Sequence, residues 1–431
     1  MSGAQATWSA DGSYIPSIEL HTKAKHQILE EYIENLIITL YGKPRYGETT
    51  FTFIDGFCGG GMYDDKDNKT HWEGSPLRII KAVREGFIKS KRRLSLNVKY
   101  IFIDNNKKHL SCLKNYSMPN ANLVNLVDGK PHDYNSDFGV LVEQCEFIFS
   151  EFENAVKYCC STASLRKGHS FFLLDPFGWT DVSMASIRTI NSLKGSEILY
   201  TYMIEELKRF VIGKHGSDAV TFNKIMEADG YYESVDIENL VKSAEQRYLR
   251  NESLRLFREK GMAEYAHTFS LIPKGCIVVK YYLMHFSQNL TALQVMKDTL
   301  WKYNNLYHLF EFQVYGFGLK TIDFYRKTAK LNLQIDDTFE SHEACIKALD
   351  RELGQLIREN RQGNYFRKIC NDTMQRNPAN RKQYEYYINL LRRDKEVEIL
   401  RKGKIVKGEN AELQNNDIIR ATGDKQIYLF F

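Results

Sequence analysis

The sequence predicts an α/β protein with a mostly parallel sheet, followed by a smaller domain of short helices and strands. Short β-branched and aromatic runs, which favour strands, alternate with patterns of helical period. Two of these runs, Thr50 to Asp55 and Lys99 to Asp104, end in an acid. The run from Ser170 to Leu174 is the most apolar of the chain and precedes Asp175. Such a run is typical of a central parallel strand that is covered on both faces.

The run that ends at Asp55 opens into the glycine-rich stretch Gly56-Phe57-Cys58-Gly59-Gly60-Gly61. A dinucleotide fingerprint needs a further glycine three residues on, and a phosphate-binding loop needs Lys directly after the last glycine. Neither pattern is present, because Met62 follows Gly61. An acid at a strand end followed by glycines resembles motif I of Rossmann-like methyltransferases that use S-adenosylmethionine (SAM). A glycine turn with a purely structural role is the alternative.

The remaining elements of the large domain are predicted from the spacing of apolar residues and from residues that start or stop helices. Residues 1–17 are expected to form a loose arm, and a helix is expected from about His21 to Leu40, its basic first turn solvated. A polar insertion covers Tyr63 to Trp72, and Ser75 is expected to cap a helix that runs to about Gly86. Residues 112–143 and 213–241 are hard to interpret. Further strands are expected at Glu146–Phe149 and Glu197–Tyr202. An antiparallel edge hairpin is expected from Ala266–Ile272 and Cys276–His285. Further helices are expected at Phe152–Cys160, Met184–Leu193, Lys242–Lys260 and Ala292–Tyr303.

The C-terminal part has a pattern of its own. Three helices and three strands are expected, with a basic turn between the first two strands: Leu353–Glu359, Tyr365–Asp372 and Ala379–Arg393, then Val397–Leu400, Asp417–Ala421 and Gln426–Phe431. This order is typical of a winged helix, a variant of the helix-turn-helix. The sequence therefore divides into a Rossmann-like domain at 1–335, with a helical insertion at about 205–262, and a winged helix domain at 340–431.

Composition narrows the class of protein. Net charge is +5, and from residue 351 onward 17 Lys and Arg face 11 Asp and Glu, so the basic excess lies in the C-terminal part. No apolar run reaches the roughly 20 residues of a membrane helix, and the N-terminus does not resemble a signal peptide. We therefore expect a cytoplasmic protein that does not use a membrane. The eight cysteines contain no C-x-x-C pair and the histidines no H-E-x-x-H, so we expect no metal site.

Acids at successive strand ends predict the cofactor site. Because the carboxyl ends of parallel strands share one edge of a sheet, Asp55, Asp104 and Glu151 should converge there. We expect Asp104 at the ribose hydroxyls of SAM and Glu151 near the adenine. The 49 residues from Asp55 to Asp104 exceed the roughly 20 of a compact unit, which we attribute to the insertion and a longer helix. The full set of expected cofactor residues is Asp55, Gly56, Phe57, Gly59, Gly61, Asp104 and Glu151.

The stretch Asp175-Pro176-Phe177-Gly178 predicts the catalytic residues. An exocyclic amine has a delocalised lone pair, and the Asp175 carboxylate with the Pro176 or Phe177 carbonyl could accept both of its hydrogens. Phe177 or Trp179 could stack on an extruded base. The stretch resembles the catalytic motif of tRNA guanine-N2 methyltransferases more than the Asp-Pro-Pro-Tyr of adenine methyltransferases. A strand-ending acid and proline that only shape the turn are the alternative.

Nucleic-acid contacts are expected in the C-terminal domain. On the helix Ala379 to Arg393 the apolar residues can face the core and leave polar residues outward, within reach of phosphates and base edges. The turn after the first strand adds three lysines. Acidic residues dilute the positive field, so a protein-docking role is the alternative. The expected contact residues are Arg381, Lys382, Asn389, Arg392, Lys402, Lys404 and Lys407.

Over nearly its full length the chain resembles the bacterial three-Cys-motif partner protein family. The stretches that carry the resemblance are His21 to His26, Phe53 to Gly61, Tyr100 to Asn105, Leu174 to Trp179, Tyr282 to Phe286 and Val295 to Lys297. The resemblance implies a methyltransferase-like domain and a partner protein with three cysteines. Two functions stay open: a SAM-dependent methyltransferase acting on RNA or DNA, or a non-catalytic module that keeps the fold and binds nucleic acid or a partner.

Overall fold

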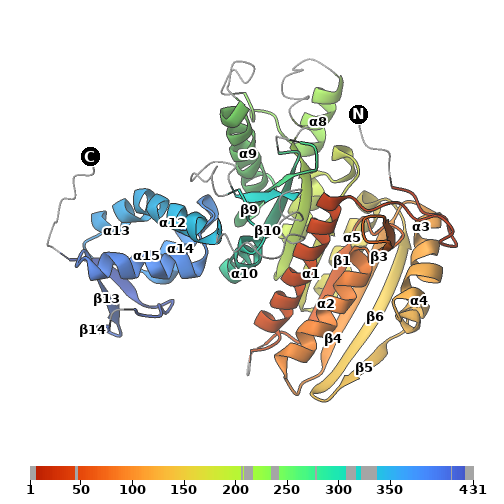
Figure 1. The fold of residues 1–431 in the computed structure, drawn as a ribbon, viewed down its shortest axis with the longest axis horizontal. Coiled ribbons are helices and arrows are strands. Elements are labelled where there is room, and N and C mark those ends of the chain that lie inside the picture. Colours follow the sequence, from red (N-terminus) through yellow and green to blue (C-terminus); the bar gives the residue numbers. More distant parts are fainter. Residues whose placement is uncertain are drawn as a thin grey trace.

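The computed structural model describes residues 6–43, 47–204, 207, 217–233, 242–276, 279–306, 317–321, 337–408 and 410–422. Within these residues nine strands form one sheet, in the order β11-β9-β10-β8-β7-β1-β4-β6-β5 (Figure 1). The strands are β1 (Thr50–Asp55), β4 (Leu96–Asp104), β5 (His132–Ser136), β6 (Gly139–Phe149), β7 (His169–Leu174), β8 (Ser196–Met203), β9 (Tyr265–Ile272), β10 (Tyr281–Ser287) and β11 (Gly318–Lys320).

Five neighbouring strands, β6-β4-β1-β7-β8, are parallel, and the most apolar strand, β7, lies at the middle of the sheet as predicted. The chain builds outward from β1 to β4 and β6, then returns to β7 and β8 on the other side of β1. This is the order of a doubly wound, Rossmann-like fold, in which ligands bind at the carboxyl ends of the strands where the order reverses. Here the reversal lies between β1 and β7.

Antiparallel strands close both sides of the parallel core. The predicted hairpin is present as β9 and β10, with β10 paired to β8, and the short β11 lies beyond β9. At the other edge β5 pairs antiparallel with β6. The sequence leaves β5 unassigned, and it predicts only the last part of β6, as a strand at Glu146–Phe149.

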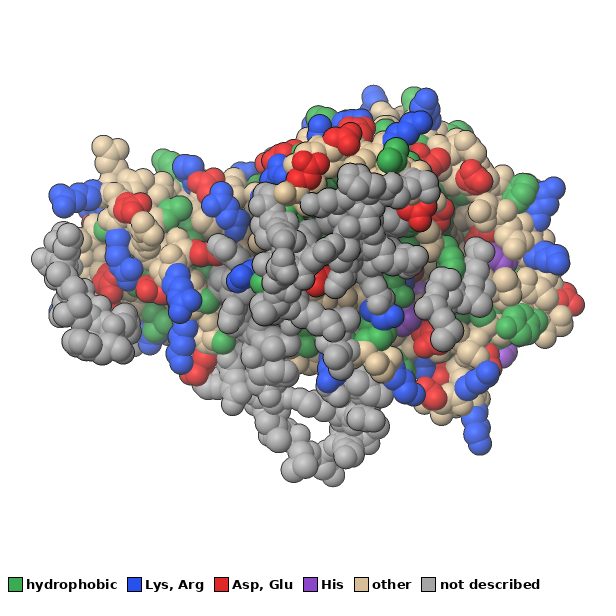
Figure 2. All heavy atoms as spheres, turned by 90° about the horizontal axis from the view of Figure 1, so that it is seen from above, with side chains coloured by type: hydrophobic (Ala, Val, Ile, Leu, Met, Phe, Trp, Pro, Cys, Tyr) green, Lys and Arg blue, Asp and Glu red, His purple; other side chains and the backbone are tan. Residues whose placement is uncertain are grey.

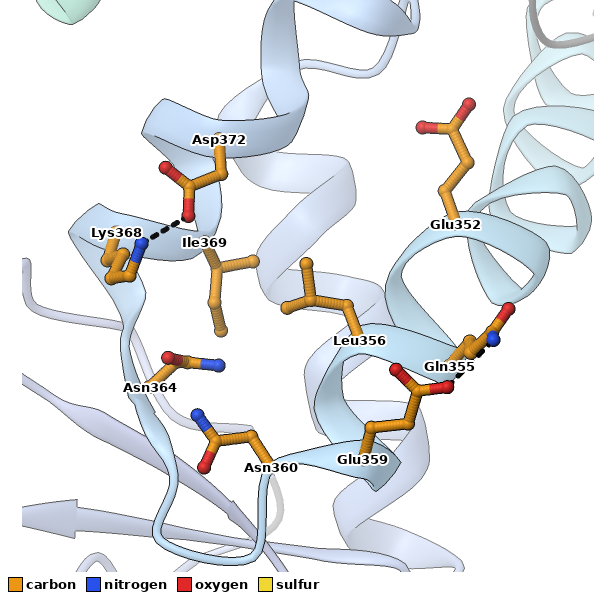
Figure 3. A pocket seen from close by; sticks show the side chains of 9 residues that line it. All are labelled: Glu352, Gln355, Leu356, Glu359, Asn360, Asn364, Lys368, Ile369 and Asp372. Atoms are coloured by element: carbon orange, nitrogen blue, oxygen red, sulfur yellow. Dashed lines mark hydrogen bonds and ion pairs between the residues drawn. The ribbon is translucent and has the colours of Figure 1, made fainter.

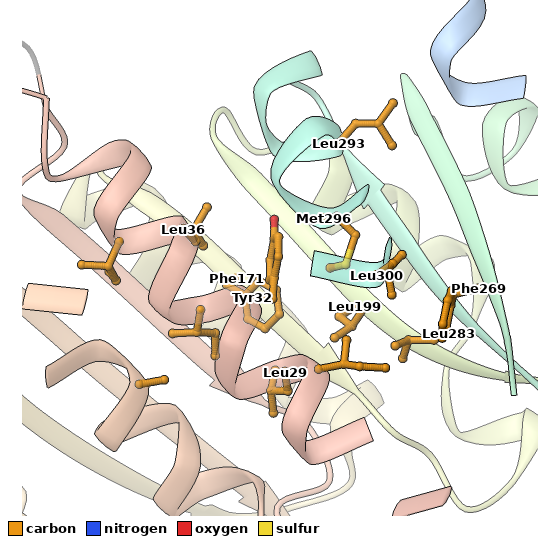
Figure 4. Close-up of a cluster of buried hydrophobic side chains, with 14 of the residues drawn as sticks. Leu29, Tyr32, Leu36, Phe171, Leu199, Phe269, Leu283, Leu293, Met296 and Leu300 are labelled. Atoms are coloured by element: carbon orange, nitrogen blue, oxygen red, sulfur yellow. The ribbon is translucent and has the colours of Figure 1, made fainter. Parts of the chain in front are cut away.

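Helices cover both faces of the sheet. Successive side chains of a strand point to opposite faces, so Tyr100 and Phe102 join one buried cluster and Ile101 and Ile103 the other. Figure 4 shows the first cluster, where side chains of α1 and α10 meet those of the strands. The helices are α1 (Leu20–Leu40), α2 (Ser75–Ser90), α3 (Lys107–Cys112), α4 (Met118–Asn120), α5 (Phe152–Arg166), α6 (Met184–Asn191), α8 (Ser217–Met226), α9 (Lys242–Glu259) and α10 (Leu290–Trp301). Across the described ranges we find no helix long and apolar enough to cross a membrane.

Two segments near the glycine turn are more ordered than the sequence predicts. The prediction of a loose arm is wrong for residues 6–17. Trp8 is only 5% exposed, and the Pro16 carbonyl accepts a hydrogen bond from the Asp64 amide. The polar insertion forms a small hairpin of β2 (Met62–Asp65) and β3 (Thr70–Glu73). Helix α2 also continues four residues beyond the predicted end.

The C-terminal part, blue in Figure 1, contains three helical segments. Its four strands form a sheet in the order β12-β15-β13-β14. Helix α12 runs through a π-helical turn at 350–354 into α13, and the sequence does not predict α12 or β12. The strand expected at Gln426–Phe431 lies outside the described residues. The elements are α12 (Asp337–Leu349), α13 (Gln355–Glu359), β12 (Asn364–Tyr365), α14 (Phe366–Thr373), α15 (Arg381–Arg393), β13 (Val397–Arg401), β14 (Lys404–Ile405) and β15 (Ile418–Ala421).

A buried lysine joins this part to the sheet domain. Lys297 of α10 is fully buried, and its Nζ donates to three backbone carbonyls just before α15, those of Met374, Asn377 and Ala379. One turn further along α10, Trp301 Nε1 donates to the Pro378 carbonyl at 2.8 Å. A segment near the start of α15 is thus held by two side chains of one helix.

Candidate functional site

The glycine-rich turn after β1 is tied to both neighbouring strands. The Gly56 amide donates to the Leu173 carbonyl of β7, and the Gly59 amide donates to Oδ2 of Asp104 in β4, both at 3.0 Å. Gly59 and Gly61 have φ of +60° and +80°, left-handed values that glycine adopts without steric cost. The turn therefore spans the carboxyl ends of three strands at the point where their order reverses.

Asp55 lies fully buried at the base of this turn. Its Oδ1 accepts from the Phe57 amide at 3.1 Å and its Oδ2 from the Ser75 hydroxyl at 2.6 Å. The sequence predicts Ser75 as the cap of α2, but Ser75 is the first helical residue and serves Asp55 instead. Burial, with smaller contributions from the Asp175 and Asp104 carboxylates, raises the pKa of Asp55 to about 7.

Asp104 is the anchor of the turn. Besides the Gly59 amide on Oδ2, its Oδ1 accepts from the Asn106 amide at 2.8 Å and lies 3.0 Å from His109 Nδ1. The Asn106 side-chain amide donates to His109 Nε2, so the ring proton is assigned to Nδ1 and faces Asp104. Three of about four acceptor positions of the carboxylate are therefore occupied within the protein.

The end of β6 lies beside the end of β4, as the predicted adenine position requires. The Ser150 amide donates to the Asp104 carbonyl at 3.2 Å, and the next residue, Glu151, is exposed and precedes α5. Phe149 is exposed here too, with Lys107 Nζ 4.9 Å from its ring centre. Sequence reasoning missed Phe149, because it looks like any other apolar residue of a strand.

Asp175, the predicted catalytic acid, is held in an ion pair. Lys25 Nζ lies 2.7 Å from Oδ1 and 2.6 Å from Oδ2. Burial opposes ionisation, but Lys25 and a hydrogen bond from Thr201 prevail and lower the pKa of Asp175. The following Pro176 is buried, whereas the Phe177 side chain is 50% exposed. Asp175 is therefore an ionised acceptor next to an open aromatic ring.

The sequence predicts a solvated first turn of α1, and this prediction is wrong. Lys23 and His26 are buried, and each basic residue of the turn has a partner. Burial lowers the pKa of His26 to about 3 and that of His21 to about 4, so both rings are neutral at pH 7. The contacts are Lys23 to Asp65 at 2.7 Å, Lys25 to Asp175, His26 Nδ1 to Trp72 Nε1 at 3.1 Å, and His21 stacked on Tyr281 at 5.2 Å.

Two further aromatic residues lie at the site without any signal in the sequence. Tyr63 of β2 is 5.8 Å from His26, ring centre to ring centre, and burial and the nearby Asp175 raise the pKa of its hydroxyl. Trp8 lies against the glycine turn. Both belong to segments that the sequence predicts as a loose arm or a polar insertion, so only the tertiary structure brings them to the site.

A second buried polar cluster lies at the opposite, amino edge of the sheet. Glu197, near the start of β8, is 3.1 Å from His285 Nε2 and 2.9 Å from His169 Nε2, and accepts from the Tyr32 hydroxyl. Burial opposes its charge, but the two histidines lower the pKa of Glu197. In the part of the chain that the structure describes, no group of three or more His, Cys, Asp or Glu is arranged to hold a metal ion.

The predicted nucleic-acid residues divide into two sets. Asn389, expected to face outward, is 5% exposed and exchanges hydrogen bonds with the backbone of Ala411. Arg381 is held by Glu385 at 2.8 Å and by Asn415 at 2.8 Å. Arg392 is half-buried. The exposed members are Lys382, Lys402, Lys404 and Lys407.

Charge is mixed on the face of the molecule that Figure 2 presents. Lys and Arg are interspersed with Asp and Glu over this face.

A cavity of about 480 Å³ lies between α13 and α14 (Figure 3). Three of its side chains are carboxylates, those of Glu352, Glu359 and Asp372, and the last pairs with Lys368 at 2.6 Å. Such a lining disfavours phosphates, so a nucleic acid would bind elsewhere on this part.

Fold and site together define an α/β protein of the Rossmann-like class, with a polar, partly buried site at the carboxyl edge of the sheet. Comparison with protein-family models finds no match for the chain, and comparison with curated protein sequences finds none.

Proposed function

We propose that this protein is a SAM-dependent methyltransferase that acts on an exocyclic base amine of a nucleic acid. The observation that carries the proposal is the meeting of Asp55, Asp104 and Asp175 around one glycine turn where the strand order reverses. Ligands of doubly wound folds bind at this position. The antiparallel β10, which pairs with β8 and β9, agrees with the antiparallel hairpin that we expect for such a sheet.

The residues of the turn suit a cationic ligand. SAM carries a sulfonium, and when bound it would supply the methyl group. Asp55 has a pKa raised to about 7 by burial and by neighbouring carboxylates, so a nearby positive charge would stabilise its ionised form. Gly56, Phe57, Gly59 and Gly61 would shape the turn, Asp104 would face the ribose and Glu151 the adenine.

The acceptor side would use Asp175, Pro176 and Phe177. Lys25 keeps the Asp175 carboxylate ionised at neutral pH, so it can accept a hydrogen bond from an amine and cannot donate one. The exposed Phe177 ring offers a surface on which an unstacked base can lie. Orientation of the amine and its increased electron density would together favour methyl transfer.

The C-terminal part would bring the nucleic acid. Three helices followed by an antiparallel ribbon support a winged helix, and Lys402, Lys404 and Lys407 are exposed on the ribbon turn. The expected three-cysteine partner protein remains part of the proposal through family resemblance alone.

A non-catalytic binding module is the second candidate. The observation that favours it is Lys25, whose ammonium contacts both oxygens of Asp175 and competes with an amine for them.

Methyl-labelled SAM incubated with total RNA or genomic DNA separates the two, with nucleosides analysed by mass spectrometry. We expect a methylated base with the wild type and none with Asp175→Ala. Cofactor binding without label transfer to either nucleic acid would favour the module.

A further inference from the structure

The arm before α1 crosses the glycine turn as an ordered strap, defined here as residues 6–19. Within it the Ser9 amide donates to the Tyr14 carbonyl at 3.0 Å. At its far end the Asp64 amide donates to Pro16, and Ile18 donates to Asp64, at 2.9 and 3.0 Å. The strap is thus fixed at one end to hairpin β2–β3, next to the turn.

Trp8 attaches the other end of the strap directly to the turn. Its indole is almost fully buried, and Nε1 donates to the Met62 carbonyl at 2.5 Å. A Cβ added to Gly60 would lie 2.2 Å from Trp8 Cγ, and one added to Gly59 would lie 2.9 Å from Cη2. Gly59 needs glycine for its positive φ, but Gly60 does not have a positive φ. The space taken by Trp8 is therefore what demands glycine at position 60.

The same indole contacts two other groups of the site. Its ring centre lies 5.1 Å from that of Tyr63 and 4.9 Å from that of His109, both edge-on. His109 faces Asp104, which in turn holds the Gly59 amide. Trp8 thus supports the turn directly, and it also supports His109, which orients the anchor Asp104.

We propose that Trp8 is a positioning residue for the cofactor turn, and that seating of the strap and binding of the cofactor are coupled. This inference rests on the proposed function. Removing the indole would free the turn, the Tyr63 ring and the His109 ring at once, so the ligand would have to order them when it binds. Coupling between two sites is reciprocal, so the ligand must also hold the strap more firmly.

S-adenosylhomocysteine (SAH), the product form of SAM, is the probe for calorimetry and hydrogen exchange. Trp8→Ala should weaken SAH binding about tenfold, within the usual range of coupling energies, while Trp8→Phe retains most of it. Gly60→Ala should mimic Trp8→Ala, because its methyl displaces the indole. If both act through one contact, the double variant should be no weaker than the single variants.

Hydrogen exchange separates this role from a merely structural one. SAH should slow exchange in residues 6–19 of the wild type and of Trp8→Phe, but not of Gly60→Ala. Equal SAH affinity of all variants, with an unprotected strap, would overturn the proposal.

If the wild type does not bind SAH, the proposed function fails, and the inference is then tested without ligand. Faster exchange at residues 56–61 in Trp8→Ala than in Trp8→Phe would support positioning of the turn. Unchanged exchange there would overturn it.

Discussion

Lys25 and Asp175 form a bidentate ion pair, with Nζ 2.7 and 2.6 Å from the two carboxylate oxygens. The pair joins the first turn of α1 to the end of the central strand β7. Both side chains are largely buried, so neither charge can be removed without leaving the other poorly solvated. The predicted catalytic acid is therefore part of an internal ion pair and lies two residues before the exposed Phe177.

Lys25→Met should destabilise the protein in a pH-dependent way. The pKa of Asp175 is lowered in the folded state. The carboxylate therefore adds to the free energy of unfolding above its unfolded pKa, and this contribution is lost as pH falls through the folded pKa. At pH 7 we expect a loss of about 1–3 kcal/mol, the usual cost of a charged group left without a partner.

Denaturant unfolding at pH 7 and at pH 4 measures this effect. The difference from wild type should narrow at pH 4, because without Lys25 burial raises the pKa of Asp175 and favours its neutral form in the folded variant. Lys25→Arg keeps the charge and serves as the control. A Lys25→Met protein as stable as wild type at both pH values would contradict the importance of the pair.

Asp55 should make SAM binding pH-dependent. Its pKa is raised to about 7, so the carboxyl is neutral below pH 7 and charged above it. A cationic ligand prefers the charged form, so SAM affinity should rise between pH 6 and 8, by at most about tenfold per pH unit, and binding should release a proton. Calorimetry in buffers of different ionisation enthalpy measures that proton. Asp55→Asn should remove both effects, and a flat wild-type profile would exclude Asp55 from the contact.

The sequence predicts the framework well, for a clear physical reason. Strands β1 and β4 are apolar runs that end in an acid, β7 is directly followed by one, and that pattern is local. The buried first turn of α1 could not be predicted, because Lys23 and His26 acquire their partners only when β2 and β3 fold beside them. Burial of a basic residue depends on such distant partners.

The candidate site residues also divide into those that a local pattern predicts and those that depend on contacts with distant segments. The positions of Asp55 and Asp104 at the ends of adjacent strands follow from strand pattern. Trp8 lies in a segment without periodicity, and its contact with Gly60 depends on packing alone. Asn389 falls on the predicted outer face of its helix, but the segment around Ala411 covers that face.

Lys297→Met should loosen the link between the two parts of the chain. Burial lowers the pKa of Lys297 to about 7, from an ordinary value of about 10.5. Between these values the unfolded chain binds more protons than the native one, so wild-type stability should rise with pH across this window. The variant lacks this rise and leaves three buried carbonyls without a donor, so it should lose more stability at pH 9 than at pH 6.

Urea unfolding followed by tryptophan fluorescence tests this, because Trp301 contacts the same segment. Lys302→Met, which removes an exposed lysine at the end of the same helix, is the matched control. Identical pH profiles for wild type and Lys297→Met would show that Lys297 does not carry the link.

The lysines of the C-terminal ribbon should determine the salt dependence of nucleic-acid binding. Each phosphate contact on a duplex contributes about 0.9 to the slope of log affinity against log salt. Changing Lys402, Lys404 and Lys407 together to Ala should therefore reduce the slope by up to about 3. Fluorescence anisotropy of labelled duplexes with the full chain measures it. Lys368→Ala, beside the acidic cavity, is the control, and a slope unaffected by the triple change would favour protein docking.

Calorimetric titration of wild type and Asp104→Ala with SAM measures whether the glycine turn and its anchor bind this cofactor. Asp104 holds the turn through Gly59 and is expected to face the ribose, so the variant should lose about tenfold or more in affinity. Asp133→Ala, an exposed carboxylate on β5, should bind as wild type does. We predict measurable SAM binding by wild type that weakens only in Asp104→Ala. No binding by wild type, or equal binding by Asp104→Ala, would show that SAM does not bind at this turn.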